Sequence, residues 1–365
     1  MDHNNASPHG RVWCLLGRKA GDNTQVLALA EALGWPFESK TILARSWELL
    51  PHLVLGATLM GINRQTSSAL APPWPDLVIS AGRRNEPVAR WIRQQSGGLT
   101  RLVHIGRPWA PPECYDLIVS TPQYFLTPGP KVLINPLPMH QFTRAGVDAA
   151  AQKASPGLAH LPRPFTTVLI GGDSGPFVFT AEKGRRLAEG INRLVRQTGG
   201  TALVTGSPRT PRAVAEAVRA TLNVPAETYW WHQRDTTNAN PYSAFLGLAD
   251  RFVVTGESMS MLAEAASLGR PLYLFDPSDP PGCWACSAHN FRHKPLSHAL
   301  AMRFAPVRMR RDISRIQNAL VQEGRARWIE NAPDLIAQGE TWTEKMRSGP
   351  LDGAHKAAAR VRALF

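Results

Sequence analysis

Three loops in the second half of the sequence carry residue types that could together hold a phosphate-bearing ligand. Each loop follows a short apolar run, and the residues concerned are Gly171, Gly172, Ser174, Gly175, Ser207, Arg209, Thr210, Glu257, Ser258, Met259 and Ser260. Glycine allows the backbone to approach a ligand closely, and serine, threonine and arginine side chains donate hydrogen bonds to phosphate oxygens. None of the loops is a GxGxxG or Walker A motif, so the predicted diphosphate site depends on their convergence.

The third loop opens a helix, which adds a backbone contribution to the same site. An apolar periodic run begins at Met259, directly after Ser258, and the N–H groups and positive dipole end of a helix attract anions. Glu264 follows one to two turns later, where its carboxylate could accept hydrogen bonds from two vicinal ribose hydroxyls. The alternative is an ordinary N-capped helix with a solvated Glu264.

The first half of the sequence offers candidates for holding and activating an acceptor. Asp22 and His104 are the two candidate catalytic bases, because a carboxylate or an imidazole can take the proton of an acceptor hydroxyl. The alternatives are a helix-capping Asp22 and a packed His104. Arg83, Arg84 and Arg107 follow apolar runs and are predicted to bind an anionic acceptor such as a lipid phosphate, the alternative being plain surface charge.

Four potential metal ligands stand close together at Cys283, Cys286, His289 and His293. Thiolate and imidazole are ligands that zinc prefers, but a zinc finger separates two ligand pairs by a longer segment. We therefore expect a Pro- and Gly-rich loop here and no metal site. No cofactor is expected either, because the nucleotide-diphosphate sugar is a substrate and a helix dipole can stabilise the leaving group in place of a divalent metal.

Apolar strands alternate with amphipathic helices in two successive halves, which predicts an α/β fold class with two Rossmann-like doubly wound domains facing a cleft. The Ala-, Pro- and Gly-rich text between the halves indicates a linker. The expected divisions are a disordered tail at 1–10, an N-terminal acceptor domain at 11–145, a linker at 146–164, a C-terminal nucleotide-sugar-binding domain at 165–330 and a helical segment at 331–365 that packs back on the first domain.

The composition indicates an anionic partner and a reducing compartment. Lys and Arg number 41 against 28 Asp and Glu, for a net charge of +13, which attracts anionic ligands and surfaces. No basic helix, RNP-like motif or finger suggests nucleic acid. The N-terminus has no signal pattern, and the longest apolar stretch, Leu49–Ile62, is too short to span a membrane. We expect a cytoplasmic protein, with a peripheral contact to the cytoplasmic membrane face as a further expectation.

Two resemblances connect these motifs to known families. The segment from Pro241 to Phe275 resembles the donor-binding region of GT-B transferases of the lipid-linked N-acetylglucosaminyltransferase type. This resemblance implies that the helix start at Ser258 holds the diphosphate and that Glu264 binds the ribose. The sequence departs from the GT-B pattern at Glu257, since an acidic residue beside the phosphates is unexpected.

Over residues 11–330, the ordered motifs GRKAGDNTQVLALAEALG, SAGRRNEPVARWIR, VHIGRPWAP, GGDSGPF and VVTGESMSMLAEA resemble the mitochondrial-fission "elongated mitochondria" family, which plants share with many proteobacteria. This resemblance implies a GT-B-like protein, with a role in envelope glycolipid synthesis for bacterial members. The leading interpretation is a metal-independent glycosyltransferase that uses a nucleotide-diphosphate sugar on an envelope lipid or glycolipid. The alternatives are a non-catalytic GT-B scaffold that recruits a partner to a membrane, and a nucleotide-sugar epimerase with the same donor half.

Overall fold

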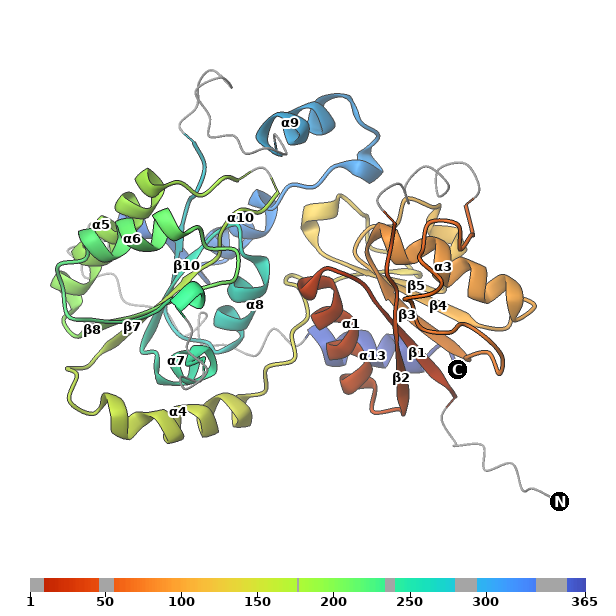
Figure 1. The fold of residues 1–365 in the computed structure, drawn as a ribbon, viewed down its shortest axis with the longest axis horizontal. Coiled ribbons are helices and arrows are strands. Elements are labelled where there is room, and N and C mark those ends of the chain that lie inside the picture. The colour runs from red at the N-terminus through yellow and green to blue at the C-terminus, as the bar shows by residue number, and fades with distance from the viewer. Residues whose placement is uncertain (1–9, 46–55, 176, 234–239, 280–293, 333–352) are drawn as a thin grey trace. The chain divides into compact units, whose positions relative to one another are not determined.

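The computed structural model describes residues 10–45, 56–175, 177–233, 240–279, 294–332 and 353–365. These residues form two compact units, each built around one parallel six-stranded sheet (Figure 1). Unit 1 comprises Met1–Gln141, Pro306–Asp312 and Asp352–Phe365, and unit 2 comprises Phe142–Ala305 and Ile313–Leu351. The chain therefore returns from unit 2 to unit 1 twice, the first time for a short segment that the sequence did not reveal.

The sheet of unit 1 has the strand order β2-β1-β3-β4-β5-β6, and every pair is parallel. The strands are β1 (Val12–Leu16), β2 (Phe37–Thr41), β3 (Leu77–Ala81), β4 (Arg101–Ile105), β5 (Leu117–Ser120) and β6 (Val132–Ile134). The predicted strands correspond to buried apolar runs, which are typical of a parallel sheet covered on both faces. The sequence analysis missed β2 because this edge strand, FESKT, is mostly exposed and polar.

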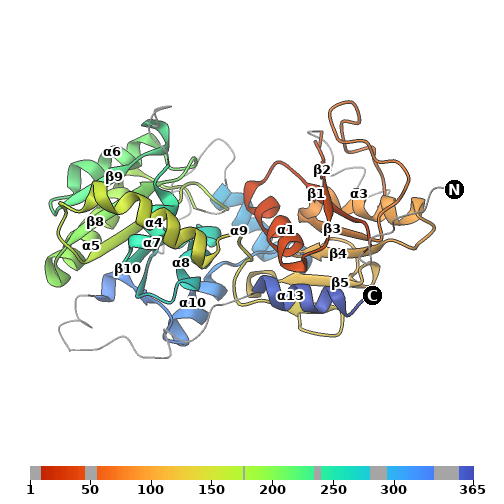
Figure 2. The same ribbon diagram turned by 90° about the horizontal axis from the view of Figure 1, so that it is seen from below.

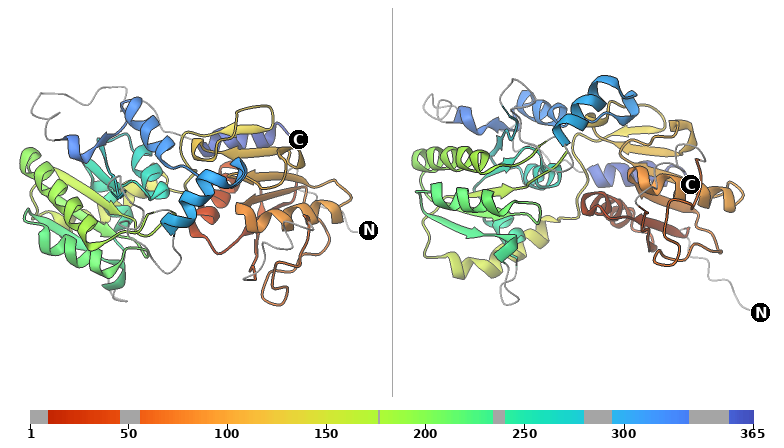
Figure 3. Two further views of the ribbon diagram at one scale, coloured as in Figure 1. Left: turned by 90° about the horizontal axis from the view of Figure 1, so that it is seen from above. Right: turned by 45° about the horizontal axis from the view of Figure 1, so that its top comes forward.

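The helices of unit 1 cover the two faces of its sheet. They are α1 (Ala20–Leu33), α3 (Gly82–Gln95) and α13 (Gly353–Arg362). One apolar cluster joins α1 and α13 to one face, and another joins α3 to the face on which Trp13 and Leu15 lie. The blue α13 lies beside the red α1, although they come from opposite ends of the chain (Figure 3).

The sheet of unit 2 has the order β12-β11-β10-β7-β8-β9, again with all pairs parallel. Its strands are β7 (Phe165–Ile170), β8 (Thr201–Gly206), β9 (Ala226–Tyr229), β10 (Arg251–Thr255), β11 (Leu272–Phe275) and β12 (Arg327–Trp328). Starting from β9, this is the doubly wound order 3-2-1-4-5-6 of dinucleotide-binding folds. The prediction of two Rossmann-like α/β domains is confirmed.

Unit 2 also has helices on both faces of its sheet. The described helices of this unit are α4 (Arg144–Leu158), α5 (Ala181–Thr198), α6 (Arg212–Thr221), α7 (Tyr242–Leu248), α8 (Met259–Ser267), α9 (Lys294–Phe304) and α10 (Ser314–Gln322). Residues of α5 and α6 share one apolar cluster with β7 and β8, whereas α4 and α7 share a second cluster on the opposite face. Figure 2 shows α4 beside α7.

Helix α4 occupies most of the segment that was predicted to be a linker at 146–164. Thr143 caps this helix by accepting a hydrogen bond from the backbone N–H of Gly146 over 3.2 Å. Val147 and Ala151 are buried, and α7 approaches so closely at Gly247 that an added Cβ would lie 2.5 Å from the Val147 carbonyl oxygen. Most of the predicted linker is therefore helical, because packing outweighs the breaker residues and Pro156 falls in the last turn.

Within the described ranges, no helix is both long and apolar enough to cross a membrane. The apolar stretch Leu49–Ile62 lies partly outside those ranges, and in its described part Leu59 and Ile62 are buried in the core of unit 1. Residues 1–9 of the predicted disordered tail also lie outside the described residues.

Candidate functional site

The strand order of unit 2 reverses between β7 and β10, and the predicted diphosphate loops meet at this point. The chain proceeds from β7 outward to β9 on one side and from β10 to β12 on the other. Connections that depart in opposite directions leave a crevice at the carboxyl ends of the two strands, where doubly wound folds bind ligands. Gly171 follows β7, Ser207 follows β8 and Glu257 lies in the turn after β10.

Hydrogen bonds join the loops after β7 and β8. Ser207 Oγ donates to the Gly171 carbonyl oxygen over 2.6 Å, and Thr210 Oγ1 donates to the same oxygen. A Cβ added to Gly172 would lie 2.0 Å from the Arg209 carbonyl oxygen, so this contact requires glycine. The hydroxyls of Ser207 and Thr210 therefore fix the loops, and the predicted role of these residues in binding a diphosphate stays a prediction.

Arg209 connects the β8 loop to the start of α8. Its Nη1 donates to the Asp173 carbonyl oxygen over 3.0 Å, and its Nη2 lies 3.4 Å from Ser258 Oγ. Ser258 is the N-cap residue of α8, but its side chain makes no capping hydrogen bond. A guanidinium, a hydroxyl and the positive end of a helix thus occur together, which is the chemistry of a phosphate-binding site.

Glu257 turns into the protein instead of standing beside a ligand. It is 2% exposed, and its Oε1 accepts hydrogen bonds from the Gly172 backbone N–H over 2.8 Å and from Thr255 Oγ1 over 3.0 Å. Burial raises the pKa of this carboxyl, while the hydrogen bond from Gly172 opposes the rise. The carboxylate links the β10 turn to the β7 loop, so the backbone is the part of Glu257 left to meet a diphosphate, and its predicted binding role stays a prediction.

The remaining predicted diphosphate residues lie in the segments that follow β7 and β10. Met259 is buried, so its backbone is the part that could face an anion at the helix start, whereas Ser260 is partly exposed. Ser174 pairs through its backbone with Phe177. Gly175 is exposed in a left-handed conformation with φ of 59°, which favours glycine.

Glu264, the predicted ribose ligand, lies on α8 with 6% exposure. Its Oε2 accepts a hydrogen bond from the hydroxyl of Tyr242 at the start of α7. Burial raises the pKa of Glu264 from 4.5 to about 7, and the hydrogen bond from Tyr242 lowers it. The carboxyl can therefore change its ionisation near neutral pH. Sequence analysis missed Tyr242, although it stands in the PYSAFLGLA helix noted for its resemblance to donor-binding regions.

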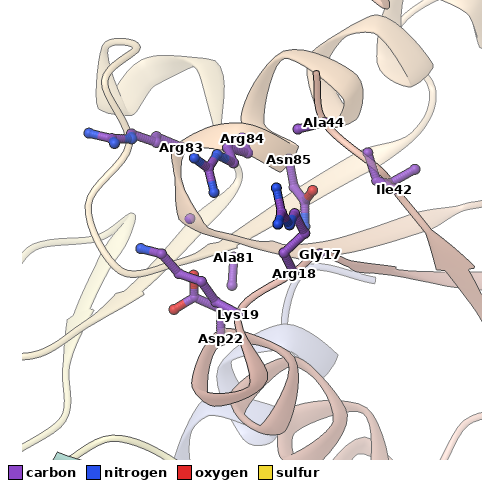
Figure 4. Close-up of a pocket in the computed structure, with 11 residues that line it drawn as sticks. Gly17, Arg18, Lys19, Asp22, Ile42, Ala44, Ala81, Arg83, Arg84 and Asn85 are labelled. Atoms are coloured by element: carbon purple, nitrogen blue, oxygen red, sulfur yellow. The ribbon is translucent and has the colours of Figure 1, made fainter. Parts of the chain in front are cut away.

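In unit 1 the strand order reverses between β1 and β3, and three of the predicted acceptor-side residues lie there. Asp22, Arg83 and Arg84 line one pocket at the ends of these strands (Figure 4). Gly82 has φ of 72°, and a Cβ added to it would lie 2.7 Å from Asp22 Oδ2. The carboxylate of Asp22 therefore packs directly over the first residue of α3.

The structure does not place His104 or Arg107 in this pocket. His104 is fully buried in β4, with Nδ1 3.0 Å from Ser80 Oγ and its ring 5.2 Å from the Tyr115 ring. A base must reach the acceptor hydroxyl, so this core position argues against His104. Arg107 donates to the Tyr124 carbonyl oxygen, and burial lowers its pKa. It holds a loop of unit 1 rather than an acceptor.

Sequence analysis did not select three other residues of the pocket: Arg18, Lys19 and Asn85. Arg18 and Lys19 lie between the end of β1 and the start of α1, the same strand-to-helix position that singled out Arg83. That position was the available signal. Asn85 belongs to the helical NEPVARWIR motif and gave no such indication, since only the fold turns it toward β1.

The four Cys and His residues at 283–293 lie outside the described residues. Among the residues that are described, no group of three or more His, Cys, Asp or Glu side chains is arranged to hold a metal ion.

Solved structures share the two-unit fold at low sequence identity. The UDP-GlcNAc 2-epimerase of Neisseria meningitidis, in a structure bound to UDP-GlcNAc, matches with a TM-score of 0.51 and 10% identity over 97% of this chain and 100% of that one. An S. aureus MnaA–UDP structure also has a TM-score of 0.51 and 10% identity, over 97% of this chain and 95% of its own. At this identity the likeness concerns the fold, which is GT-B-like.

Sequence relatives give the family. An uncharacterised Rickettsia prowazekii protein, RP120, is 26% identical over 73% of this chain and 83% of its own length. The mitochondrial fission protein ELM1 of Arabidopsis thaliana is 26% identical over 60% of this chain, and the match spans 56% of the plant protein. The family model for mitochondrial fission ELM1 matches residues 20–365. This coverage confirms the resemblance noted from the motifs: the chain belongs to the mitochondrial fission ELM1 family.

Proposed function

We propose that this protein is a GT-B-like glycosyltransferase that binds a nucleotide-diphosphate sugar at the β7/β10 switch point of unit 2. The observation that carries the proposal is the meeting of Arg209 and Ser258 at the start of α8, 3.4 Å apart. The diphosphate would lie over this helix start, and the ionised carboxylate of Glu264 would accept hydrogen bonds from the ribose.

In the proposed reaction, the sugar leaves a nucleoside diphosphate whose terminal phosphate gains negative charge. Arg209 and the backbone N–H groups at the start of α8 would stabilise that charge without a divalent metal. The acceptor would bind in unit 1, an envelope lipid or glycolipid being the class that the proposal favours. Asp22 is the proposed base, since it lines the unit 1 pocket whereas His104 is enclosed in the core.

Titration with UDP-, GDP- and ADP-sugars, followed by calorimetry, tests donor binding. UDP-GlcNAc belongs in the panel because the Neisseria neighbour is described as bound to it. A hydrogen bond to a charged group contributes about 1.5–3 kcal/mol, so Arg209→Ala and Ser258→Ala should each weaken binding about tenfold or more. Arg212→Ala, an exposed position on the following helix, and Ser267→Ala, at the far end of α8, are the matched controls.

Titration with these nucleotide-sugars also distinguishes the proposed glycosyltransferase from the scaffold and the epimerase. Binding of no nucleotide-sugar at millimolar concentration would overturn the proposal and leave the non-catalytic scaffold, which recruits a partner to a membrane, as the better interpretation. Binding that the Arg209 and Ser258 variants do not weaken would remove the site from unit 2. Where binding occurs, analysis of the sugar product distinguishes transfer to an acceptor from epimerisation.

A further inference from the structure

The pocket at the β1/β3 switch point of unit 1 gathers more positive charge than its own carboxylate can balance. Arg18, Lys19, Arg83 and Arg84 line it together with a single acidic residue, Asp22. The sticks in Figure 4 show these side chains around the loops that follow β1 and β3. The pocket is open to solvent, and its cavity volume of about 30 Å³ leaves room for one small group rather than for a whole ligand.

The cations of this pocket act on one another. Desolvation lowers the pKa of Lys19, and the charges of Arg311, Arg83 and Arg84 lower it further, while Asp22 raises it. Arg311 comes from the short segment Pro306–Asp312 that returns to unit 1, where its Nε donates to Gln123 Oε1 over 2.7 Å. Four cationic side chains therefore line the pocket with one carboxylate, and Arg311 adds a fifth positive charge near Lys19, an arrangement that an anion would stabilise.

The backbone and one buried amide supply further polar groups. Helices α1 and α3 both begin at the pocket, and neither has a side-chain cap. Asn85, in the first turn of α3, is 4% exposed and lines the pocket. Its Nδ2 donates to the Leu15 carbonyl oxygen over 3.0 Å, and its Oδ1 has no hydrogen-bond partner among the described residues. The oxygen is a buried acceptor suited to a ligand hydroxyl.

These features select a phosphoryl group over a carboxylate. A phosphomonoester carries about −1.5 to −2 charges at neutral pH and three acceptor oxygens, which matches several arginine forks and two helix N-termini. A ligand with a single carboxylate carries one negative charge and would neutralise only part of the positive charge of the pocket.

We propose that the unit 1 pocket binds the phosphoryl group of a phosphomonoester or diphosphate substrate, with Arg18, Lys19 and Arg84 as its ligands. The binding itself needs no second substrate, whereas the assignment of this ligand as the sugar acceptor rests on the proposed function. The phosphoryl group could belong to a soluble phosphate ester or to a lipid headgroup, because both present the same oxygens.

The test uses the full chain and two probes that share a glycerol 3-phosphate moiety, one soluble and one a lipid. Glycerol 3-phosphate is titrated by calorimetry, and phosphatidylcholine vesicles with and without phosphatidic acid are tested by co-sedimentation. Arg18→Ala and Arg84→Ala should each weaken binding about tenfold. The exposed positions Arg64 and Lys131 of unit 1 give matched controls, whose alanine variants should bind within about twofold of the unmodified protein. Unchanged thermal midpoints show that the variants fold.

The outcomes separate this inference from the proposed function. Binding of glycerol 3-phosphate that depends on Arg18 and Arg84 supports the pocket and a soluble ester, and binding of the phosphatidic acid vesicles alone supports the pocket and a lipid source. Absence of binding to both probes, or binding that Arg18→Ala and Arg84→Ala leave unchanged, overturns the inference even if nucleotide-sugars bind unit 2. Conversely, pocket-dependent phosphate binding without nucleotide-sugar binding leaves this inference intact and removes the proposed donor site.

Discussion

Glu257 illustrates how one residue can contradict its sequence context and still be explained by the fold. In the sequence, an acid follows a strand at the point where a GT-B protein would hold phosphates. In the structure, its carboxylate takes the backbone N–H of Gly172 and the hydroxyl of Thr255 as partners. An added Cβ on Gly171 would lie 2.0 Å from Glu257 Oε1. Gly171 thus makes room for the carboxylate and Gly172 for the Arg209 carbonyl, so neither glycine needs a ligand to account for it.

The ionisation of Glu264 makes the stability of unit 2 depend on pH. Its pKa in the folded protein is about 7, raised from 4.5, so the folded state retains a proton that the unfolded chain has released. Stability therefore falls as pH rises from about 4.5 to 7 and then levels off. From the size of the pKa change, this carboxyl contributes a loss of about 3 kcal/mol across that window.

Denaturant unfolding at a series of pH values tests this contribution. Glu264→Gln should remove it, so that the variant gains stability relative to the unmodified protein as pH rises from about 4.5 to 7. Glu189→Gln, at an exposed position of α5, should leave the pH profile unchanged. Tyr242→Phe should move the window to higher pH, because the hydrogen bond from Tyr242 lowers the pKa of Glu264. A constant difference between the Glu264 variant and the unmodified protein at every pH would contradict the prediction.

At the scale of elements, the sequence predicted those whose own residues carry the signal. Buried strands such as β1 and β11 are continuous apolar runs, and α5 and α6 show apolar residues at helical spacing. Strands β2 and β12 were missed because one is polar and exposed and the other has two residues. The side chains that meet at the start of α8 were predicted from strand-end positions, whereas the inward turn of Glu257 depends on contacts with distant glycines.

Helix α4 shows most clearly what the sequence alone does not contain. Its composition, rich in alanine and glycine, is typical of a linker, and only the packing of α7 against it explains why it is helical. Val147 and Ala151 then pack against a helix that has glycine at position 247, where an added Cβ would lie 2.6 Å from the Ala151 Cβ. The stability of α4 is therefore expected to come from this close approach, since its intrinsic helix propensity is reduced by Gly146, Gly157 and Pro156.

Enlarging Ala151 should consequently destabilise unit 2. Ala151→Leu adds methyl groups where the two helices already touch, and overpacking of this kind costs about 1–3 kcal/mol. Ala149→Leu makes the same change at an exposed position of the same helix and should alter stability by no more than about 0.5 kcal/mol. Chemical denaturation of the full chain measures both. Equal effects of the two substitutions would show that α4 does not pack on α7 as described.

At the scale of the whole molecule, the same architectural device appears twice. Each unit has a parallel sheet whose strand order reverses once, and in each unit the residues selected for anion binding, except Arg107, lie at or beside that reversal. The β7/β10 point carries a guanidinium and a hydroxyl at one helix start, whereas the β1/β3 point carries four cations at two helix starts. The two proposed anion sites would suit a reaction between two phosphate-bearing substrates, and the net charge of +13 is consistent with both.

Helix α13, at the far end of the chain from α1, completes the core of unit 1. Ala357, Ala358 and Val361 of α13 are fully buried in the cluster that α1 shares with the sheet of unit 1. Ala358→Glu would place a carboxylate in this apolar core without a partner, and a change of that kind costs about 3 kcal/mol or more. Ala359→Glu makes the same substitution at the neighbouring exposed position of α13 and should have little effect.

Hydrogen exchange measured by mass spectrometry should locate the damage. With Ala358→Glu, peptides from β1, α1 and β3 should lose protection by at least tenfold, whereas peptides from β7, β8 and α5 should keep theirs, because the core of unit 2 contains no residue of α13. The Ala359→Glu variant should match the unmodified protein throughout. Equal loss of protection in both units would mean that the two cores unfold as one, and the C-terminal helix would then support the whole chain instead of unit 1.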